Sequence, residues 1–197
     1  MNFGYGYDGF SMKLSPVRRF QKGFTLIELL VVIGILGILA AALVATIDPF
    51  EQLKKADDAK IKNIAVEYQT SLVRYYTTHG AFPWNDANNT NGVCTGIGGA
   101  DIAGDLGAVG LLSCTNINLI GEGELKSSFT SNLTDLGKVR LIWASAAPTD
   151  ITVCFSPTSK SQKAAPDTKW TNLAADADPA TCPKATAADG DCWWCTK

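Results

Sequence analysis

The fold of this chain is decided by residues 24–47, which read FTLIELLVVIGILGILAAALVATI and carry a single charged side chain, Glu28. As a helix, this stretch would measure about 36 Å, which exceeds the roughly 30 Å of hydrocarbon in a bilayer. The whole chain is an ordinary 46% hydrophobic and 18% charged, so its apolar residues are concentrated here. A globular core would distribute them over several elements. The stretch therefore predicts one membrane-spanning helix.

Positive charge precedes the apolar stretch. Residues 1–23 have a net charge of +3, so the rest of the chain contributes −5 to the total of −2. Basic residues beside a span favour its cytoplasmic side, which predicts a single-pass inner-membrane protein with a cytoplasmic N-terminus. An acidic body also lacks the basic footprint of a nucleic-acid-binding domain, and no nucleic-acid partner is expected.

Residues 1–23 are interpreted as a leader peptide, and Met12, where a short basic leader would begin, is the suspected true start. The competing interpretation is a cleaved secretory signal, whose apolar region is usually about 7–15 residues long and ends at a small-residue cleavage site. Ala40, Ala41 and Ala42 could supply that site. The chain would then be a secreted binding domain.

A second helix, amphipathic rather than apolar, is predicted over residues 48–80. Asp48 can cap it with Pro49 at its first helical position, and Gly80 followed by Pro83 marks its end. Apolar side chains recur mostly every three or four residues. They place on one face Leu53, Ala56, Ile61, Ile64, Tyr68, Leu72 and Tyr75. The other face is predicted to carry Glu51, Lys54, Lys55, Asp58, Lys62, Glu67 and Arg74.

Residues 81–197 are predicted to form a globular head. Residues 84–137 are rich in Gly, Asn, Ser and Thr, and predict a long connecting region with one short helix. Residues 138–144 and 151–155 are β-prone runs that predict a hairpin. Residues 192–195 predict a last edge strand. The expected fold class is α+β.

Six cysteines lie beyond the apolar stretch: Cys94, Cys114, Cys154, Cys182, Cys192 and Cys195. An even number on the presumed outer side fits an oxidising compartment and up to three disulfides, with all fifteen connectivities open. Cys192-x-x-Cys195 has the spacing of a redox motif, which would make the chain a membrane-anchored redox domain. Such a motif is expected at a helix start after a strand, so structural disulfides are favoured.

No catalytic residue, cofactor or metal is predicted, and the chain is not expected to be an enzyme. His79 is the only histidine, which leaves a hydrolytic triad with little support, and its place near a helix end suits a capping or surface residue. Asp101 and Asp105 are minor candidates for a calcium loop, but the pattern is not an EF-hand.

Glu28 is the exception inside the apolar stretch. An acidic residue at mid-span costs about 2.5–3.5 kcal/mol, and somewhat less one turn from the end. It could be an interfacial glutamate that reaches the headgroups. Alternatively, cutting the chain after Gly23 would free an α-amino group on Phe24. That ammonium could pair with Glu28 of a neighbouring copy and fix the register between subunits.

The string Gly23-Phe24-Thr25-Leu26-Ile27-Glu28, after a short basic leader and before an apolar helix, resembles the prepilin N-terminus of type IV pilins and type II secretion pseudopilins. The resemblance covers residues 18–48 closely and extends loosely to Phe82-Pro83. It implies cleavage between Gly23 and Phe24, N-methylation of Phe24, and Glu28 as the acid that guides subunit addition. The chain departs from the family near Ala45, where a proline is often found.

The resemblance implies a structural subunit of a type IV pilus-like or secretion pseudopilus filament, extracellular or periplasmic. The implied partners are the prepilin peptidase/methyltransferase, other pilin subunits, an assembly platform protein, an ATPase and membrane lipid. The implied fold is pilin-like. Its long N-terminal helix, with a membrane half at 24–47 and an outer half at 48–80, would pack on a small antiparallel sheet with disulfides. The head, 81–197, would hold the αβ-loop and a C-terminal β region.

Overall fold

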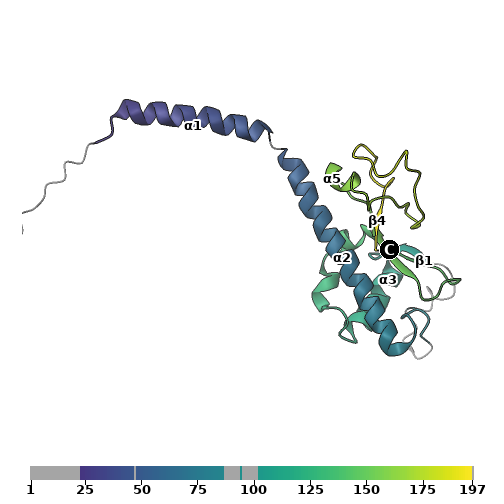
Figure 1. The fold of residues 1–197 in the computed structure, drawn as a ribbon. Coiled ribbons are helices and arrows are strands. Elements are labelled where there is room, and N and C mark those ends of the chain that lie inside the picture. Colours follow the sequence, from purple (N-terminus) through teal and green to yellow (C-terminus); the bar gives the residue numbers. More distant parts are fainter. Residues whose placement is uncertain (1–22, 47, 87–93, 95–101, 197) are drawn as a thin grey trace, which may run out of the picture. The chain divides into compact units, whose positions relative to one another are not determined.

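The computed structural model describes residues 23–46, 48–86, 94 and 102–196 (Figure 1). The chain divides into two compact units, one ending at Ile47 and one beginning at Asp48, and each is described by itself. The predicted leader, apart from Gly23, lies outside the described residues. The helices are α1 (Leu26–Thr46), α2 (Pro49–His79), α3 (Val109–Cys114), η1 (Thr115–Ile120), η2 (Ser127–Ser131), α4 (Leu133–Leu136) and α5 (Lys160–Lys163). The strands are β1 (Ile102–Asp105), β2 (Val139–Trp143), β3 (Ile151–Phe155) and β4 (Trp194–Cys195).

Nearly all of the described part of the first unit is α1, an α-helix of 21 residues. Its residues Leu26–Val44 are long and apolar enough to cross a membrane, and none of them is buried within the chain. A cleaved signal sequence has the same length and apolar character, so the helix alone does not separate the two interpretations.

The second unit is built on α2, whose ends follow the sequence signals. Asp48 Oδ1 accepts hydrogen bonds from Phe50 N at 3.1 Å and Glu51 N at 3.3 Å, with Pro49 at the first helical position. At the other end, Gly80 adopts a left-handed φ of 73° and donates its N–H to Tyr76 O. An L side chain would be strained at this φ, which explains the glycine. The predicted start and stop of this helix are confirmed.

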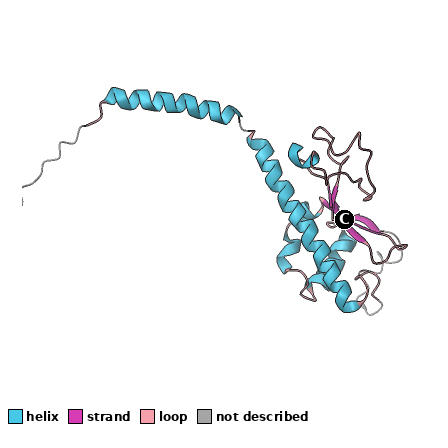
Figure 2. Cartoon of the chain, in the orientation of Figure 1, coloured by secondary structure: helices cyan, strands magenta, loops and turns pink. Residues whose placement is uncertain are grey.

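Four antiparallel strands form one sheet in the order β1-β2-β3-β4. Figure 2 draws the strands in magenta and the helices in cyan. The predicted hairpin is confirmed: β2 and β3 pair from Val139 opposite Phe155 to Trp143 opposite Ile151. The last edge strand predicted over residues 192–195 is confirmed at Trp194–Cys195 only, where β4 pairs with β3 alone and ends the sheet. The chain therefore has the expected α+β fold, with a long helix beside a small antiparallel sheet.

The core lies between α2 and one face of the sheet. Tyr68 and Leu72 of α2 and Leu141 and Val153 of the sheet are each at most 2% exposed. Burial raises the pKa of Tyr68 to about 12, although its hydroxyl hydrogen-bonds Thr115 Oγ1 at 3.1 Å. Burying such side chains contributes about 1.5–3 kcal/mol each. The apolar face predicted for α2 thus forms the core from Ile61 onward.

The first turns of α2 contradict the prediction. Leu53 is 67% exposed and Ala56 is also exposed, although both were assigned to the buried face. The reason is length, because a helix of 31 residues extends about 46 Å while a strand of five residues covers about 17 Å. The sheet is too short to cover both ends of the helix.

Asp58 was assigned to the polar face of α2 but is only 2% exposed. Its carboxylate accepts hydrogen bonds from both N–H groups and both hydroxyls of Thr158 and Ser159, at 2.6 to 3.2 Å. Ser159 is the N-cap of α5, and its hydroxyl also accepts a bond from Gln162 N. A buried carboxylate with this many donors replaces the hydration it has lost.

The region 84–137 contains more structure than the predicted connection with one short helix. It includes β1, α3, η1, η2 and α4. After Ile102, the residues of β1 are Ala-Gly-Asp, which have little β propensity. Their strand geometry comes from the ladder with β2, from Ile102–Trp143 to Asp105–Arg140. Pairing with a distant strand is not visible in a local pattern.

All six cysteines form disulfides, which resolves the open connectivity: Cys94–Cys114, Cys154–Cys195 and Cys182–Cys192. Cys154–Cys195 joins directly opposed residues of β3 and β4. With Ala174 it forms a second small core on the sheet face opposite α2, against which Ile142, Trp170 and Trp193 pack. The C-terminal segment is thus held to the sheet covalently as well as by packing.

Loop length predicts that the three bridges differ in their contribution to stability. Cys154–Cys195 closes a separation of 41 residues and Cys182–Cys192 one of 10. In the chain-entropy description the longer loop contributes about 1 kcal/mol more. We expect Cys154→Ser/Cys195→Ser to lower the free energy of unfolding by that much more than Cys182→Ser/Cys192→Ser. Denaturant unfolding of the two double variants measures the difference, and equal losses would contradict this ranking.

Candidate functional site

The candidate site is the N-terminal end of α1. Thr25 is the N-cap, because its carbonyl accepts the first helical bond, from Leu29 N at 3.3 Å. Its hydroxyl accepts a bond from Glu28 N, also at 3.3 Å. Glu28 Oε2 in turn accepts bonds from Thr25 N at 2.9 Å and Thr25 Oγ1 at 2.8 Å. This reciprocal arrangement is a capping box.

The capping box holds the Glu28 carboxylate at the tip of the helix and leaves one of its oxygens available to accept a hydrogen bond. Both bonds from Thr25 use Oε2, while Oε1 of Glu28 makes no hydrogen bond to any described residue. The carboxylate is exposed, and so is Phe24, at 85%. A cation approaching this end of α1 would therefore meet an oriented carboxylate oxygen.

Thr25 is the site residue that sequence reasoning missed. The spacing Thr25-x-x-Glu28 is the capping-box signature, so the signal was present in the sequence. The charge of Glu28 inside an apolar stretch is the more conspicuous feature, and it draws attention away from this local spacing.

The sides of α1 need a partner outside the chain. Its large apolar side chains between Leu26 and Val44 are 48% to 81% exposed. A continuous apolar surface of this extent is not stable in water, and lipid or other apolar helices must cover it.

The structure separates the cysteines of the CxxC spacing. Cys192 is bonded to Cys182 and Cys195 to Cys154, and both are at most 5% exposed. A dithiol couple between Cys192 and Cys195 would require both bridges to break. The structure therefore gives no support to the redox interpretation.

The other candidates have local partners. His79, the last residue of α2, stacks on Tyr75 with ring centroids 4.0 Å apart. Its Nε2 lies 3.6 Å from Glu122 Oε2. Asp105 lies 3.6 Å from Arg140 Nε, and Asp101 falls outside the described residues. Among the residues that are described, no group of three or more His, Cys, Asp or Glu side chains is placed to hold a metal.

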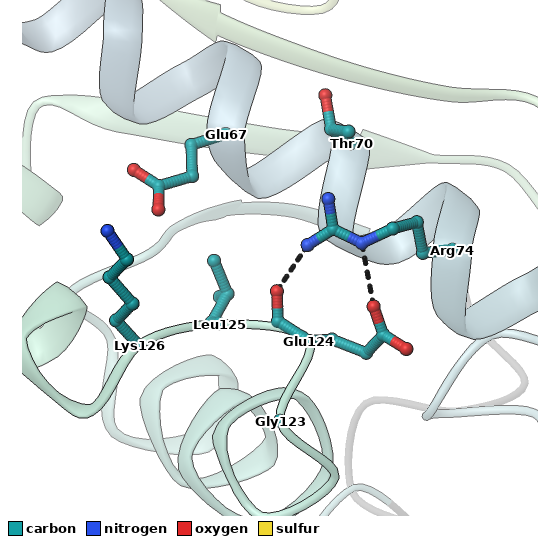
Figure 3. Close-up of a pocket in the computed structure, with 7 residues that line it drawn as sticks. All are labelled: Glu67, Thr70, Arg74, Gly123, Glu124, Leu125 and Lys126. Atoms are coloured by element: carbon teal, nitrogen blue, oxygen red, sulfur yellow. Dashed lines mark hydrogen bonds and ion pairs between the residues drawn. The ribbon is translucent and has the colours of Figure 1, made fainter.

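An open groove of about 560 Å³ runs beside α2 and was not predicted (Figure 3). Arg74 crosses it, donating from Nε to Glu124 Oε2 at 2.7 Å and from its terminal nitrogen to the Glu124 carbonyl. Glu67 and Lys126 line the same groove, so its charges are balanced. Arg74 acts here as a clamp that holds the loop around Glu124 on α2.

Comparison with known proteins bears on the N-terminal site. The family model for the prokaryotic N-terminal methylation motif matches residues 18–44, the segment that contains the capping box. A fimbrial protein of Neisseria meningitidis serogroup B is 39% identical over 75 residues, which are 38% of this chain and 42% of that protein. The N-terminal region of this chain is therefore similar to that of these fimbrial and pilin proteins.

Two further relatives are also named as pilin or fimbrial proteins. The type IV major pilin protein PilE1 of Neisseria gonorrhoeae is 34% identical over 107 residues, covering 54% of this chain and 45% of the relative. The fimbrial protein EcpC of Eikenella corrodens is 35% identical over 71 residues, covering 36% and 45%. The chain thus spans less than half the length of these pilins. No solved structure matches it significantly.

Proposed function

We propose that this protein is a structural subunit of a type IV pilus-like filament, made as a membrane-anchored precursor and assembled through α1. The observation that carries the proposal is an apolar helix with no buried residue whose one charge, Glu28, is held at its N-terminal tip within the methylation motif. The relatives are named as pilins and fimbrial proteins, which favours a pilus over a secretion pseudopilus.

In the proposed mechanism a prepilin peptidase cuts between Gly23 and Phe24 on the cytoplasmic side and the new N-terminus is methylated. The α-ammonium of one subunit then meets Oε1 of Glu28 on its neighbour. The pair neutralises two charges in apolar surroundings, and only one alignment of neighbouring α1 helices forms it. It therefore sets the register between the α1 helices that pack together in the filament. An ATPase and a platform protein would move the subunits out of the inner membrane into the filament.

Gly23 supports a recognition role for this segment. Apart from its chain neighbours, a side chain at this position would meet no atom of the described residues within 4 Å, and no left-handed φ is found at Gly23. The fold itself therefore does not require glycine here. A protease that must fit the chain into a narrow site does benefit from it.

The proposal predicts the mature N-terminus. Mass spectrometry of the protein from intact cells is expected to find methylated Phe24 as the first residue, and Gly23→Val is expected to leave the precursor uncut. Gly34→Ala is the control, because a Cβ added at Gly34 would also meet none of the surrounding atoms that the structure describes within 4 Å. This variant should be processed normally. A mature chain that begins at Ala42 or Leu43 would contradict the proposal and indicate a secreted domain.

A further inference from the structure

The first turn of α2 carries large apolar side chains that the second unit does not use. Phe50 is 74% exposed and Leu53 is 67% exposed, on a helix whose other apolar face is buried from Ile61 onward. They lie three residues apart, so they are neighbours on the helix surface. Neither belongs to the core clusters of the unit.

Chain length keeps this pair near the bilayer. With 21 residues, α1 is about 31 Å long and matches a hydrocarbon thickness of about 30 Å. Phe50 follows Thr46 by four residues, so the chain cannot carry it more than about 14 Å from the end of α1. The headgroup layer beyond the hydrocarbon is roughly 5–8 Å thick, within that reach.

The charges of the same turns suit lipid phosphates. Each carboxylate there has a protein partner: Asp48 caps α2, Glu51 Oε1 accepts from Ser161 N at 3.3 Å, and Asp57 pairs with Lys138 Nζ at 2.7 Å. Lys54 and Lys55, by contrast, have no carboxylate partner in the part of the chain that the structure describes. Lysines beside apolar anchors at a membrane surface extend toward phosphate groups.

We infer that, before assembly, the first turn of α2 docks on the outer surface of the membrane that holds α1, with Phe50 and Leu53 in the headgroup layer and Lys54 and Lys55 on lipid phosphates. Docking holds the head close to the bilayer while the subunit waits. It must be released when α1 leaves the lipid, so it adds to the work of extraction. The inference rests on the membrane anchoring that is part of the proposed function.

The test uses the full-length protein in vesicles of phosphatidylcholine and phosphatidylglycerol. Since all six native cysteines are in disulfides, a spin label can be attached to a single new thiol in Leu53→Cys or, as the matched control, Val73→Cys. Val73 is 47% exposed on the same helix, 20 residues further from the span. The measured quantity is the ratio of the label's collision rate with oxygen to its collision rate with a water-soluble nickel chelate. This ratio is expected to be several-fold higher at position 53 than at position 73.

Two results would overturn the inference. One is an equal, water-exposed profile at both positions. The other is a label at 53 that neither reagent reaches, together with spin–spin broadening that grows as the protein-to-lipid ratio is raised. That result would mean that a second copy of the protein, and not lipid, covers Leu53. Neither result changes the mature N-terminus at Phe24. Failure of the proposed function would instead show as an unprocessed chain or as protein that does not float with the vesicles.

Discussion

Glu28→Gln is expected to leave the protein inserted and cleaved but to lower filament yield by at least about a hundredfold. Glutamine also serves at this position of a capping box, so the tip of α1 keeps its structure. In the proposed filament the charge would be lost, and the ammonium of the neighbouring subunit would be left unpaired among apolar helices. Removing one partner of a buried ion pair leaves the other charge uncompensated and costs about 3–5 kcal/mol. Each 1.4 kcal/mol corresponds to about a tenfold change in affinity. Quantifying sheared filaments against total membrane-bound subunit measures the effect.

Thr25→Val is the control that separates the charge from the cap. It removes the hydroxyl that bonds Glu28 but keeps the Thr25 N–H and the carboxylate. Losing a side-chain cap costs about 1 kcal/mol, so filament yield should fall far less than in Glu28→Gln. Normal assembly by Glu28→Gln, with mature Phe24 confirmed by mass, would refute the pairing of Glu28 with a terminal amine.

Local signals in the sequence were enough to predict the parts of the fold that local physics determines. The ends of α2 follow from Asp48, Pro49 and Gly80, because capping and a left-handed residue act within one turn of the chain. The hairpin of β2 and β3 follows from two β-prone runs joined by a short turn. The long apolar helix α1 follows from composition alone.

Features that depend on distant contacts were not predictable. The strand β1 exists because β2 lies beside it, and Cys154 pairs with Cys195 because β3 and β4 adjoin. The exposure of Leu53 depends on where the sheet ends. At the site, the position of Glu28 was predicted and its bond to Thr25 was not, although the capping-box spacing was readable in the sequence.

Asp58 is the clearest case, and it leads to the largest expected effect on stability. Its carboxylate is the acceptor for donors that lie about 100 positions later in the chain. Thr158 and Ser159 begin the segment that leads through α5 to β4, so this one side chain ties the C-terminal region to α2. A periodic pattern assigns a charged residue to the solvent face by default, and only the tertiary contact reverses that assignment.

Asp58→Ala is expected to lower the free energy of unfolding by about 4 kcal/mol, because it leaves the buried N–H and hydroxyl of Ser159 without their acceptor. Asp57→Ala is the matched control. Asp57 is the adjacent residue, its side chain is 40% exposed, and it pairs with Lys138 at the surface, so its loss should cost at most about 1 kcal/mol.

Denaturant unfolding of the detergent-solubilised full chain measures both variants. The five tryptophans (Trp84, Trp143, Trp170, Trp193 and Trp194) all lie beyond Asp48, so their fluorescence reports on the second unit alone. Asp58→Asn should fall between the other two, because the amide keeps one acceptor oxygen but turns a donor toward Thr158 or Ser159. If Asp58→Ala unfolds as Asp57→Ala does, the segment after β3 is held by its disulfides and apolar contacts, and the buried carboxylate is not what joins it to the helix.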